Sequence, residues 1–464
     1  MRLGEQTKER RQKQMDGDEK NLYERTLYRR KRRMRNQIIV YTVVFILLAV
    51  MAAGGVFGVR FLVERAEARQ QEKELAEQLE ALTKAEQEVI TPPVSAEEIS
   101  DVMEEEETDW LEELVTASIA EMSLEDKVAG LFLTTPEAIT GVGKAVQAGD
   151  GTREALEQYA VGGLVYSGRN IQSREQLIEM LSNTKSMSKY PLFLAIEEDG
   201  DSTSGVAGSG IGAEAAGDMW EIGESGNTET AYQSGVQTAS YLKELGFNLN
   251  LGPAADLTEA PDQSVVGKDS YGKDPGASGS MAASAVSGME ETGISACLKH
   301  FPGIGSAASD PAKGMAVLDR SMEDLQAAEL EAFRMGMSTG VDMIMVSHVS
   351  LPQILGDQRP CSLSEEMVTD VLRGKLGYQG IILTDAMDQG AVTEYYAAGE
   401  AAVMAFKAGC DMVFMPGNFE EAYQAVLSAV KEGVIAQERV EESLKKIYRV
   451  KLRDKLETAS AEGQ

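Results

Sequence analysis

Lys299-His300-Phe301-Pro302-Gly303-Ile304-Gly305 is the stretch that decides the fold, together with the loop that follows it to Asp319-Arg320-Ser321. It continues the apolar run from Ile294 to Leu298, which is typical of a buried strand. It then opens into Pro, Gly, Ser and Ala residues, which indicate a loop. A Lys-His pair where a strand becomes a loop lies where α/β folds often carry out chemistry. The alternative is a Lys and a His that only pack against a turn.

Seven further apolar runs of strand length accompany this one, and amphipathic segments such as Ser321–Thr339 and Ser364–Leu376 separate them. Eight strands alternating with helices predict one (β/α)8 barrel of the TIM type over residues 111–455. An open, doubly wound sheet is the second fold that the pattern allows. The eight predicted strands are Leu131–Thr135, Gly163–Ser167, Leu192–Glu197, Phe247–Pro253, Ile294–His300, Met343–Val349, Ile381–Asp385 and Met412–Pro416.

Polar side chains follow most of these runs, at the point where each strand is expected to end. In a barrel of parallel strands these ends meet at one mouth, where the loops after the strands build the site. Each group alone could be a solvated strand end, but together they predict a site there. The groups are Glu197-Glu198-Asp199, Asp256, Lys299-His300, His348, Thr384-Asp385 and Asn418.

One glycine-rich segment imitates a dinucleotide-binding motif. Gly208 to Ala213 reads Gly-x-Gly-x-x-Ala, but it lies well past the end of its strand and among Gly, Ala and Ser residues. A dinucleotide site needs a tight turn from strand to helix. We therefore predict a lid-like loop at this place.

The N-terminal part carries the signals of a membrane anchor. Residues 1–36 hold 13 Lys/Arg and 6 Asp/Glu, whereas the whole chain has a formal charge of −31. Ile38 to Val59 is an apolar run of 22 residues without a charge, long enough to span a bilayer. The positive-inside rule then predicts a cytoplasmic head at 1–36, a transmembrane helix at 37–60 and an extracellular barrel. A cleaved signal peptide is the alternative.

Two further segments separate this helix from the barrel. Residues 61–90 are rich in Glu, Gln, Ala, Leu and Lys and predict a helical stalk, either a single helix or a weak coiled coil. Residues 91–110 begin at Thr91-Pro92-Pro93, contain an acidic run, and predict a flexible linker. Residues 456–464 form a short tail.

Composition excludes several classes of function. The strongly acidic body argues against nucleic acid as a partner, and the basic head favours an anionic lipid leaflet. Three scattered cysteines, Cys297, Cys361 and Cys410, are too few for a disulfide framework. With two histidines in the chain, no cluster has metal-ligand spacing, so we expect neither a metal nor another cofactor.

These residues together resemble glycoside hydrolase family 3, and most of all its single-domain bacterial β-N-acetylhexosaminidases. The resemblance extends from about Leu111 to Leu452 and rests on several motifs in addition to the Lys-His-Phe-Pro-Gly-x-Gly stretch. The motifs are Met122 to Phe132, Gly162-Gly163-Leu164-Val165, Gly246-Phe247-Asn248 with Pro253 and Asp256, Asp319-Arg320-Ser321, Ser347-His348-Val349 and Thr384-Asp385-Ala386-Met387.

The resemblance implies a role for each site residue. Asp385 matches the carboxylate nucleophile of a retaining glycosidase, which forms a covalent glycosyl-enzyme. A helix N-cap is the alternative use of this Asp. Lys299 and His300 match a pair that hydrogen-bonds sugar hydroxyls, and His348 matches a second contact. Glu197 and Asp199 are expected to bind substrate at the third strand.

Four positions depart from the family pattern. The acid/base His of the loop after the fifth strand is Ala312 here, although its partner two residues earlier remains as Asp310. The family's Pro-Gly-His-Gly has Ile304 in place of His, and its sugar-binding Arg falls at Asp269. Its Gly-Gly-Arg has become Gly200-Asp201-Ser202. General acid catalysis is typically worth ~10²–10⁴-fold, so we expect impaired turnover.

The sequence therefore predicts a membrane-anchored enzyme that hydrolyses terminal β-linked N-acetylglucosamine, with cell-wall fragments as the implied substrate class. The competing hypothesis is a non-catalytic protein that binds a wall saccharide or a protein partner, and the Ala at position 312 favours it. A third hypothesis is a structural anchor whose stalk oligomerises.

Overall fold

A computed structural model of the protein describes residues 110–200 and 205–462. The predicted cytoplasmic head, transmembrane helix and stalk lie outside these residues, as does nearly all of the predicted linker, so they stay predictions. Within the described ranges, no helix combines the length and the apolar character that a membrane span requires.

Eight parallel strands close into a barrel, as the sequence predicts, and each strand pairs with its neighbour in the chain's order. The last strand, β10, pairs with β1 through Phe132 opposite Val413 and closes the ring. A doubly wound open sheet is excluded by this closure. The barrel strands are β1 (Phe132–Thr134), β2 (Gly163–Tyr166), β3 (Phe193–Ile196), β4 (Leu249–Asn250), β5 (Ser295–Phe301), β7 (Met343–Val346), β9 (Ile381–Ala386) and β10 (Met412–Phe414).

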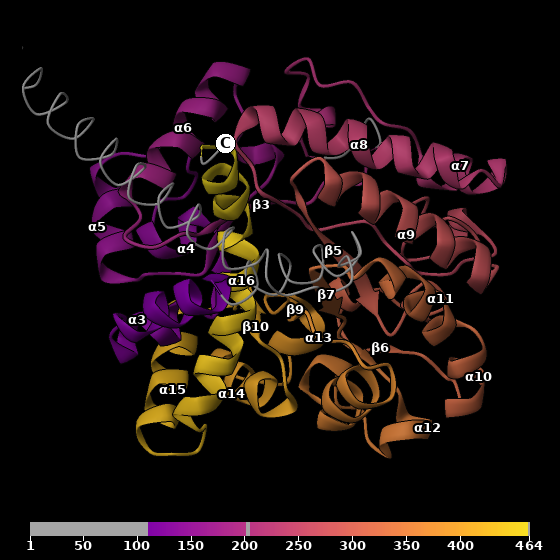
Figure 1. Ribbon diagram of the computed structural model, residues 1–464. Coiled ribbons are helices and arrows are strands. Elements are labelled where there is room, and N and C mark those ends of the chain that lie inside the picture. The colour runs from indigo at the N-terminus through magenta and orange to yellow at the C-terminus, as the bar shows by residue number, and fades with distance from the viewer. Residues whose placement is uncertain (1–109, 201–204, 463–464) are drawn as a thin grey trace, which may run out of the picture. The chain divides into compact units, whose positions relative to one another are not determined.

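Helices surround the strands and cover the outer face of the barrel (Figure 1), while the inner face closes on itself. This explains why the strands read as continuous apolar runs rather than as alternating patterns. The α-helices are α3 (Leu124–Ala129), α4 (Pro136–Thr140), α5 (Asp150–Gln158), α6 (Arg174–Met187), α7 (Met219–Ser225), α8 (Thr228–Leu245), α9 (Pro275–Glu291), α10 (Met322–Ala327), α11 (Glu329–Gly336), α12 (Pro352–Leu355), α13 (Gly390–Thr393), α14 (Ala398–Ala408), α15 (Phe419–Lys431) and α16 (Gln437–Glu462). Short 3₁₀ turns are η1 (Gly168–Asn170), η2 (Ala207–Ser209), η3 (Pro261–Gln263), η4 (Pro311–Lys313), η5 (Met337–Thr339) and η6 (Cys361–Leu363), and η7 (Glu366–Lys375) is a π-helix.

The two amphipathic segments named from the sequence are less regular than continuous α-helices. Ser321–Thr339 divides into α10, α11 and η5, because Ala328 leaves the helical conformation at φ −123° and ψ −87°. The core of Ser364–Leu376 is the π-helix η7, which buries Met367, Val368, Val371 and Leu372.

The stretch that decided the fold forms the end of β5 and the tight loop after it. Gly303 has φ +128°, a conformation that side chains with a Cβ rarely adopt. At Gly305 a Cβ would lie 2.0 Å from the carbonyl oxygen of Leu257, which is too close for any other residue. Gly305 therefore lets the loop after β5 lie against the loop after β4, while Gly303 allows the turn itself.

A small parallel sheet of β6 (Ala316–Val317) and β8 (Val349–Ser350) lies outside the barrel. It pairs Ala316 with Val349 and thereby joins the loop after β5 to the loop after β7. These strands have two residues each, so the sequence offered no periodic signal for them.

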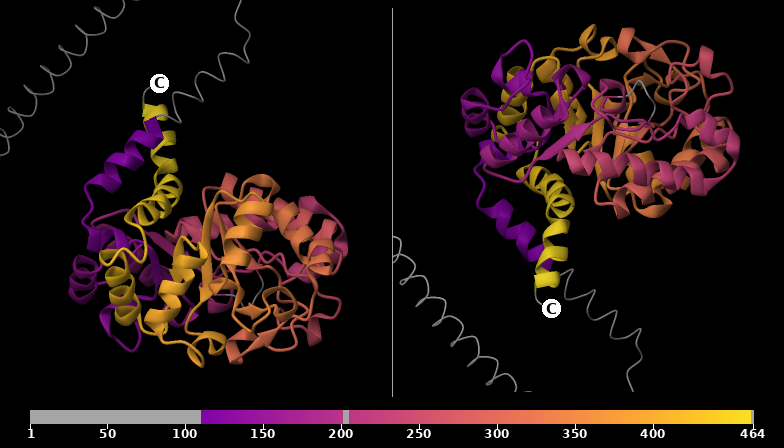
Figure 2. Two further views of the ribbon diagram at one scale, coloured as in Figure 1. Left: turned by 90° about the horizontal axis from the view of Figure 1, so that it is seen from below. Right: turned by 90° about the horizontal axis from the view of Figure 1, so that it is seen from above.

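The long helix α16 closes the chain and runs beside the first described helix, which spans residues 110–120 (Figure 2). An ion pair between Arg449 and Glu112 connects the two helices. The start and the end of the described chain are thus held together, next to the N-terminal ends of the strands.

Candidate active site

Lys299 lies at the end of β5 and is almost completely buried, with 1% of its surface exposed. Its Nζ is 2.6 Å from Glu197 Oε1 and 3.0 Å from Asp199 Oδ1, both on the segment that follows β3. Burial opposes the charged form, but the two carboxylates outweigh it and raise the pKa of Lys299 well above its usual range. The charge of Lys299 lowers the pKa of Glu197, while burial raises the pKa of Asp199. The structure thus brings together three of the predicted site residues.

His300 is held by Asp256, which follows β4. Asp256 Oδ2 lies 2.7 Å from His300 Nδ1 and also accepts the backbone N–H of His300 at 3.1 Å, while Oδ1 accepts the N–H of Ile304 at 2.6 Å. Burial alone would lower the pKa of His300, but the charges of Asp256 and Asp385 raise it to about 9. His300 is therefore an imidazolium at neutral pH, close to Asp385.

Asp385 lies at the end of β9 with 5% of its surface exposed. Its Oδ1 accepts the N–H of Ala386 at 2.7 Å and the side-chain amide of Gln389 at 3.0 Å. Both donors engage the same oxygen, which leaves Oδ2 for a reacting carbon. The ion pairs of Lys299 are to Glu197 and Asp199, and the positively charged group beside Asp385 is His300.

His348 was predicted to contact substrate; this role stays a prediction, and the structure shows what surrounds the ring. The side chain is fully buried, and Nε2 lies 3.0 Å from the carbonyl oxygen of Ala386 while Nδ1 lies 2.7 Å from Ser362 Oγ. A carbonyl only accepts, so Nε2 carries the proton. Burial lowers the pKa of His348, which favours this neutral form. Both ring nitrogens therefore have protein partners, and the bond to Ala386 connects His348 to the end of β9.

The loop after β5 contains positions 310 and 312, which the sequence resemblance assigned to the acid/base pair. Asp310 caps η4 by accepting the N–H of Ala312 at 2.9 Å, and its other oxygen lies 3.2 Å from Lys313 Nζ. Ala312 itself is exposed. Asp310 therefore belongs to a local turn and an ion pair, whereas the other predicted site residues gather at the strand ends.

A cavity of about 810 Å³ opens beside these residues, at the C-terminal ends of β1, β2, β3 and β10. Its lining includes Glu197 and Asp199 of the predicted site, and also Asp269. Asp385 lies one strand away, because Ala386 of β9 is opposite Phe414 of β10, which lines the cavity. This volume is typical of pockets that hold small molecules.

The segment at 205–209 forms part of the cavity wall and is fixed by Glu198. This carboxylate is fully buried and accepts the N–H groups of Val206 at 2.6 Å and Ala207 at 3.3 Å. Burial raises the pKa of Glu198 to about 7. The glycine-rich segment contains η2 and no strand-turn-helix, which agrees with the rejection of a dinucleotide motif. Asp201 and Ser202, predicted departures from the family, lie outside the described residues.

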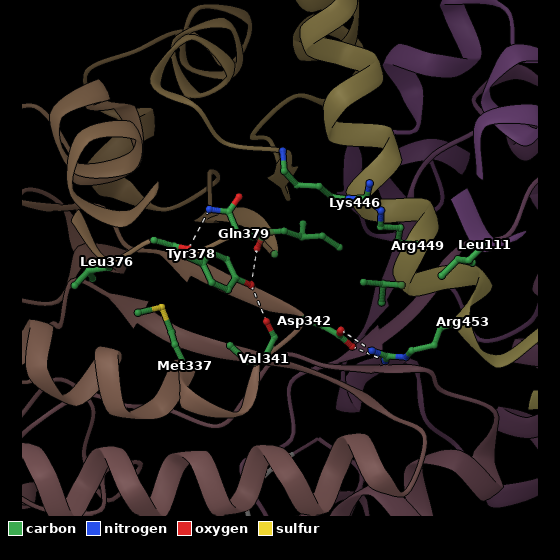
Figure 3. A pocket seen from close by; sticks show the side chains of 15 residues that line it. Leu111, Met337, Val341, Asp342, Leu376, Tyr378, Gln379, Lys446, Arg449 and Arg453 are labelled. Atoms are coloured by element: carbon green, nitrogen blue, oxygen red, sulfur yellow. Dashed lines mark hydrogen bonds and ion pairs between the residues drawn. The ribbon is translucent and has the colours of Figure 1, made fainter. Parts of the chain in front are cut away.

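A second cavity of about 440 Å³ lies at the opposite end of the barrel, where β7 and β9 begin (Figure 3). Its cations already have anionic partners: Arg453 pairs with Asp342 at 2.7 Å, and Lys446 pairs with Asp411 at 3.1 Å. Because chemistry in barrels of this type lies at the C-terminal end of the strands, this cavity is a structural feature of the N-terminal face.

Among the side chains placed within 110–200 and 205–462, no three His, Cys, Asp or Glu residues are grouped so that they could hold a metal ion. The three cysteines are buried and unpaired.

Comparison with protein families gives a match to the model described as "Glycosyl hydrolase family 3 N terminal domain", over residues 123–450. These bounds include every barrel strand and all of the site residues described above. The resemblance read from the sequence motifs is thereby confirmed.

Individual relatives carry related names. The chain is 27% identical over 344 residues to "Beta-hexosaminidase A" of Pseudoalteromonas piscicida, covering 66% of this chain and 56% of that protein. It is 30% identical over 284 residues to "Beta-hexosaminidase" of Stenotrophomonas maltophilia, covering 59% and 82%. A solved family 3 beta-N-acetylglucosaminidase of a Paenibacillus species superposes with a TM-score of 0.68 at 28% identity, over 72% of this chain and 63% of that one.

Proposed function

Because the chain belongs to glycosyl hydrolase family 3 and resembles its β-hexosaminidases, we propose that it hydrolyses terminal β-linked amino sugars with retention of configuration. The observation that carries this proposal is Asp385, with one oxygen fixed and the other available at the mouth of the barrel. N-acetylglucosamine in cell-wall fragments is the substrate that the relatives' names favour.

Asp385 is proposed as the nucleophile. A retaining glycosidase needs an ionised carboxylate that attacks the anomeric carbon and is later released by water. His300, whose pKa is raised to about 9, places a positive charge beside this carboxylate. Gln389 and the N–H of Ala386 both donate to Oδ1, which fixes the orientation of the carboxylate and so of the attacking oxygen, Oδ2.

Proton donation is the weak step of this site. The family's acid/base His is Ala312 here, and Asp310 is engaged with Lys313 and with its own turn. A leaving group that needs a proton is therefore expected to depart more slowly than in an enzyme with the acid. The rate should be lower by roughly the 10²–10⁴-fold that general acid catalysis provides. Aryl leaving groups that depart as stable anions avoid this limit.

A second candidate function is binding without turnover. Ala312 and Asp269 favour it, because the first removes the proton donor and the second replaces a sugar-binding guanidinium of the family with a carboxylate. In that case the cavity beside Glu197 and Asp199 would still hold a saccharide.

A hydrolysis assay separates these two functions. The full-length chain is tested with p-nitrophenyl β-hexosaminides alongside the variants Asp385→Asn and Asp388→Asn, the latter an exposed Asp three residues further on. We expect release of nitrophenol that Asp385→Asn abolishes and Asp388→Asn retains. Saccharide binding measured by calorimetry without any hydrolysis would move the conclusion to the binding function.

We also propose that Ile38–Val59 anchors the protein in the membrane with the barrel outside. The positive head at residues 1–36 and the uncharged run after it support this orientation. Protease added to intact cells is expected to remove the barrel, and complete protection with a sealed membrane would contradict it.

A further inference from the structure

Glu198 is a buried carboxyl group that the proposed mechanism does not use. It stands between Glu197 and Asp199, which both line the cavity at the barrel mouth, whereas Glu198 itself is fully buried and does not belong to the lining. Its backbone is fixed to β4, because its N–H donates to Asn250 Oδ1 at 3.0 Å and its carbonyl oxygen accepts the amide of Asn250 at 2.8 Å. The carboxyl group therefore starts from a fixed point on the barrel.

This carboxyl group carries residues 205–209, which we call the wall segment because three of them line the cavity. Glu198 Oε2 accepts the N–H of Val206 at 2.6 Å and the N–H of Ala207 at 3.3 Å. At Gly205 a Cβ would lie 2.9 Å from the Ile196 side chain, so the segment passes close to β3. The position of one cavity wall thus depends on the hydrogen bonds that Glu198 accepts.

The second oxygen of Glu198 has a different environment. Among the residues that the structure describes, neither Glu198 Oε1 nor the hydroxyl oxygen of Tyr241 on α8 has a partner at hydrogen-bond distance. Burial raises the pKa of Glu198 to about 7, although the two N–H groups and the nearby Tyr241 hydroxyl lower it. The charge of Asp199, which is paired with Lys299, raises it further. The neutral and the ionised form of Glu198 are therefore both populated near pH 7.

We propose that Glu198 is a positioning residue that holds the wall segment against the barrel as a neutral carboxyl group and loosens it when ionised. The inference rests on the proposed function, because the wall segment would shape the site for the sugar. A neutral carboxyl group can keep both N–H groups on Oε2 and turn its own O–H toward the Tyr241 oxygen. The ionised group lacks this donor and leaves a charge in a place without water, which is costly.

The direction of the pH dependence follows from what happens when the wall segment moves. Val206 and Ala207 lie directly on Glu198, so moving them away exposes the carboxyl group to water and returns its pKa toward the ordinary value of about 4.5. A carboxyl group with the higher pKa in the attached arrangement favours that arrangement at low pH, and the preference is lost as the pH rises through about 7. The attached arrangement should therefore be about tenfold less favoured at pH 8 than at pH 6.

Hydrogen exchange of the full-length chain tests this without any substrate. The protection of the Val206 and Ala207 amides, corrected for the intrinsic effect of pH on exchange, should fall about tenfold between pH 6 and pH 8. The amide of Leu251 is an internal control, because it donates to the carbonyl oxygen of Ile196 at 2.8 Å and not to a group that titrates. Its protection should stay constant over the same range.

Variants assign the effect to Glu198. Glu198→Gln keeps an acceptor for the two N–H groups and a donor toward Tyr241 but cannot ionise, so protection should stay at the parent's pH 6 level at both pH values. Glu198→Ala removes the acceptor and should lower protection at both. Glu224→Gln is the matched control, since Glu224 is an exposed residue of α7, and it should behave as the parent. A melting curve shows that each variant is folded, and the parent's own pH dependence needs no variant.

Kinetics then test whether the wall segment matters for substrate. With p-nitrophenyl β-N-acetylglucosaminide, the KM of the parent relative to that of Glu198→Gln should be near 1 at pH 6 and rise by up to about tenfold at pH 8. The ratio of their kcat values should stay near 1, because Glu198 does not contact the reacting groups. Comparing the two proteins at each pH cancels the titration of other groups, which both share.

The outcomes separate this inference from the proposed function. Protection that does not fall toward pH 8, or that falls equally in Glu198→Gln, overturns the inference, and the hydrolase assignment stands as long as nitrophenol is released. The expected exchange with a KM ratio that stays near 1 at both pH values also overturns it, because the wall segment then does not position substrate. If no glycoside is turned over, the hydrolase assignment fails, and hydrogen exchange still decides whether Glu198 holds the wall segment.

Discussion

At the scale of single residues, the fold raises the pKa of His300 to about 9. Asp256 Oδ2 accepts the backbone N–H of His300 and lies within hydrogen-bond distance of its ring Nδ1. Asp385 lies near enough to add a second negative charge. The fold therefore places a positively charged ring beside Asp385 at the ends of the strands.

The first prediction concerns this charge. Asp256→Asn is expected to lower the pKa of His300 from about 9 toward the ordinary value of ~6.5, because the anionic partner is lost. The chain has only two histidines, so NMR of protein with labelled histidine resolves them, and His300→Gln assigns the signals.

The same pKa has a consequence for stability. A folded pKa raised above the unfolded one stabilises the protein fully below about pH 6.5, and the stabilisation is lost as the pH rises through about 9. The parent should therefore lose stability over this range, and Asp256→Asn should lose less. A His300 that titrates near 6.5 in both proteins would refute this account.

The sequence indicated the site residues better than it indicated their partners. Strand-end polar groups such as Asp385 and Lys299 follow apolar runs and are visible in the chain. Asp256 holds His300 across 44 positions, and Ser362 holds His348 across 14, so neither contact has a local signal. Asp256 was noticed at a strand end but not counted in the site, and Gln389, four residues after Asp385, was missed although its spacing could have suggested it.

At the scale of elements, Asp411 at the start of β10 ties the last strand to the helices around it. This carboxylate is fully buried and pairs with Arg373 of η7 and with Arg439 and Lys446 of α16. Three cations from two helices thus share one anion. The arrangement closes the barrel where β10 meets its neighbours.

The second prediction tests this junction. Asp411→Ala should lower the free energy of unfolding by about 3–5 kcal/mol, because it leaves partly buried cations without their anion. Glu112→Ala removes the partner of Arg449, in an ion pair that is more exposed than that of Asp411. It should lower the free energy of unfolding by less than about 1 kcal/mol. Urea unfolding measures both, and equal losses would show that Asp411 does not hold the elements together.

The third prediction concerns the loop after β5. Ala312 is exposed and follows Asp310 in η4, so a His can be placed there without displacing the core. Ala312→His should raise hydrolysis of an N-acetylglucosaminide with a poor leaving group by roughly 10²-fold, the low end of general acid catalysis.

A second substitution sharpens this test. Asp269→Arg restores the family's cation in the cavity and should favour the N-acetylated substrate. The double variant should therefore hydrolyse the N-acetylglucosaminide faster than either single variant. Activated aryl glycosides serve as the control, since they need no proton. If both single variants and the double variant stay at background, the missing acid does not explain slow turnover.

The strands and helices could be predicted from the sequence to different degrees. The eight barrel strands were predicted because parallel strands covered on both faces are continuously apolar. The amphipathic segment Ser321–Thr339 was recognised, but its interruption at Ala328 was not, and the π-helix η7 has no distinct signal in its apolar spacing. β6 and β8 form only because the loops that contain them are brought together by the barrel.

At the scale of the whole molecule, the fourth prediction is that residues 111–464 fold without the N-terminal segments. The barrel closes its own sheet through β1 and β10, and an ordinary domain with its own core can fold alone. Circular dichroism should show a cooperative melt of this fragment. An aggregated fragment without a transition would indicate that the preceding residues are required.

The fifth prediction tests the central claim, that the molecule is a retaining glycosidase with Asp385 as its nucleophile. An activated fluorosugar inactivator forms the covalent intermediate without needing the missing proton donor, and the intermediate then accumulates. Peptide mass mapping of the inactivated full-length chain should find one glycosyl unit on the peptide that contains Asp385, and none in Asp385→Asn. A label on another residue, hydrolysis undiminished in Asp385→Asn, or neither label nor hydrolysis in the parent would contradict it.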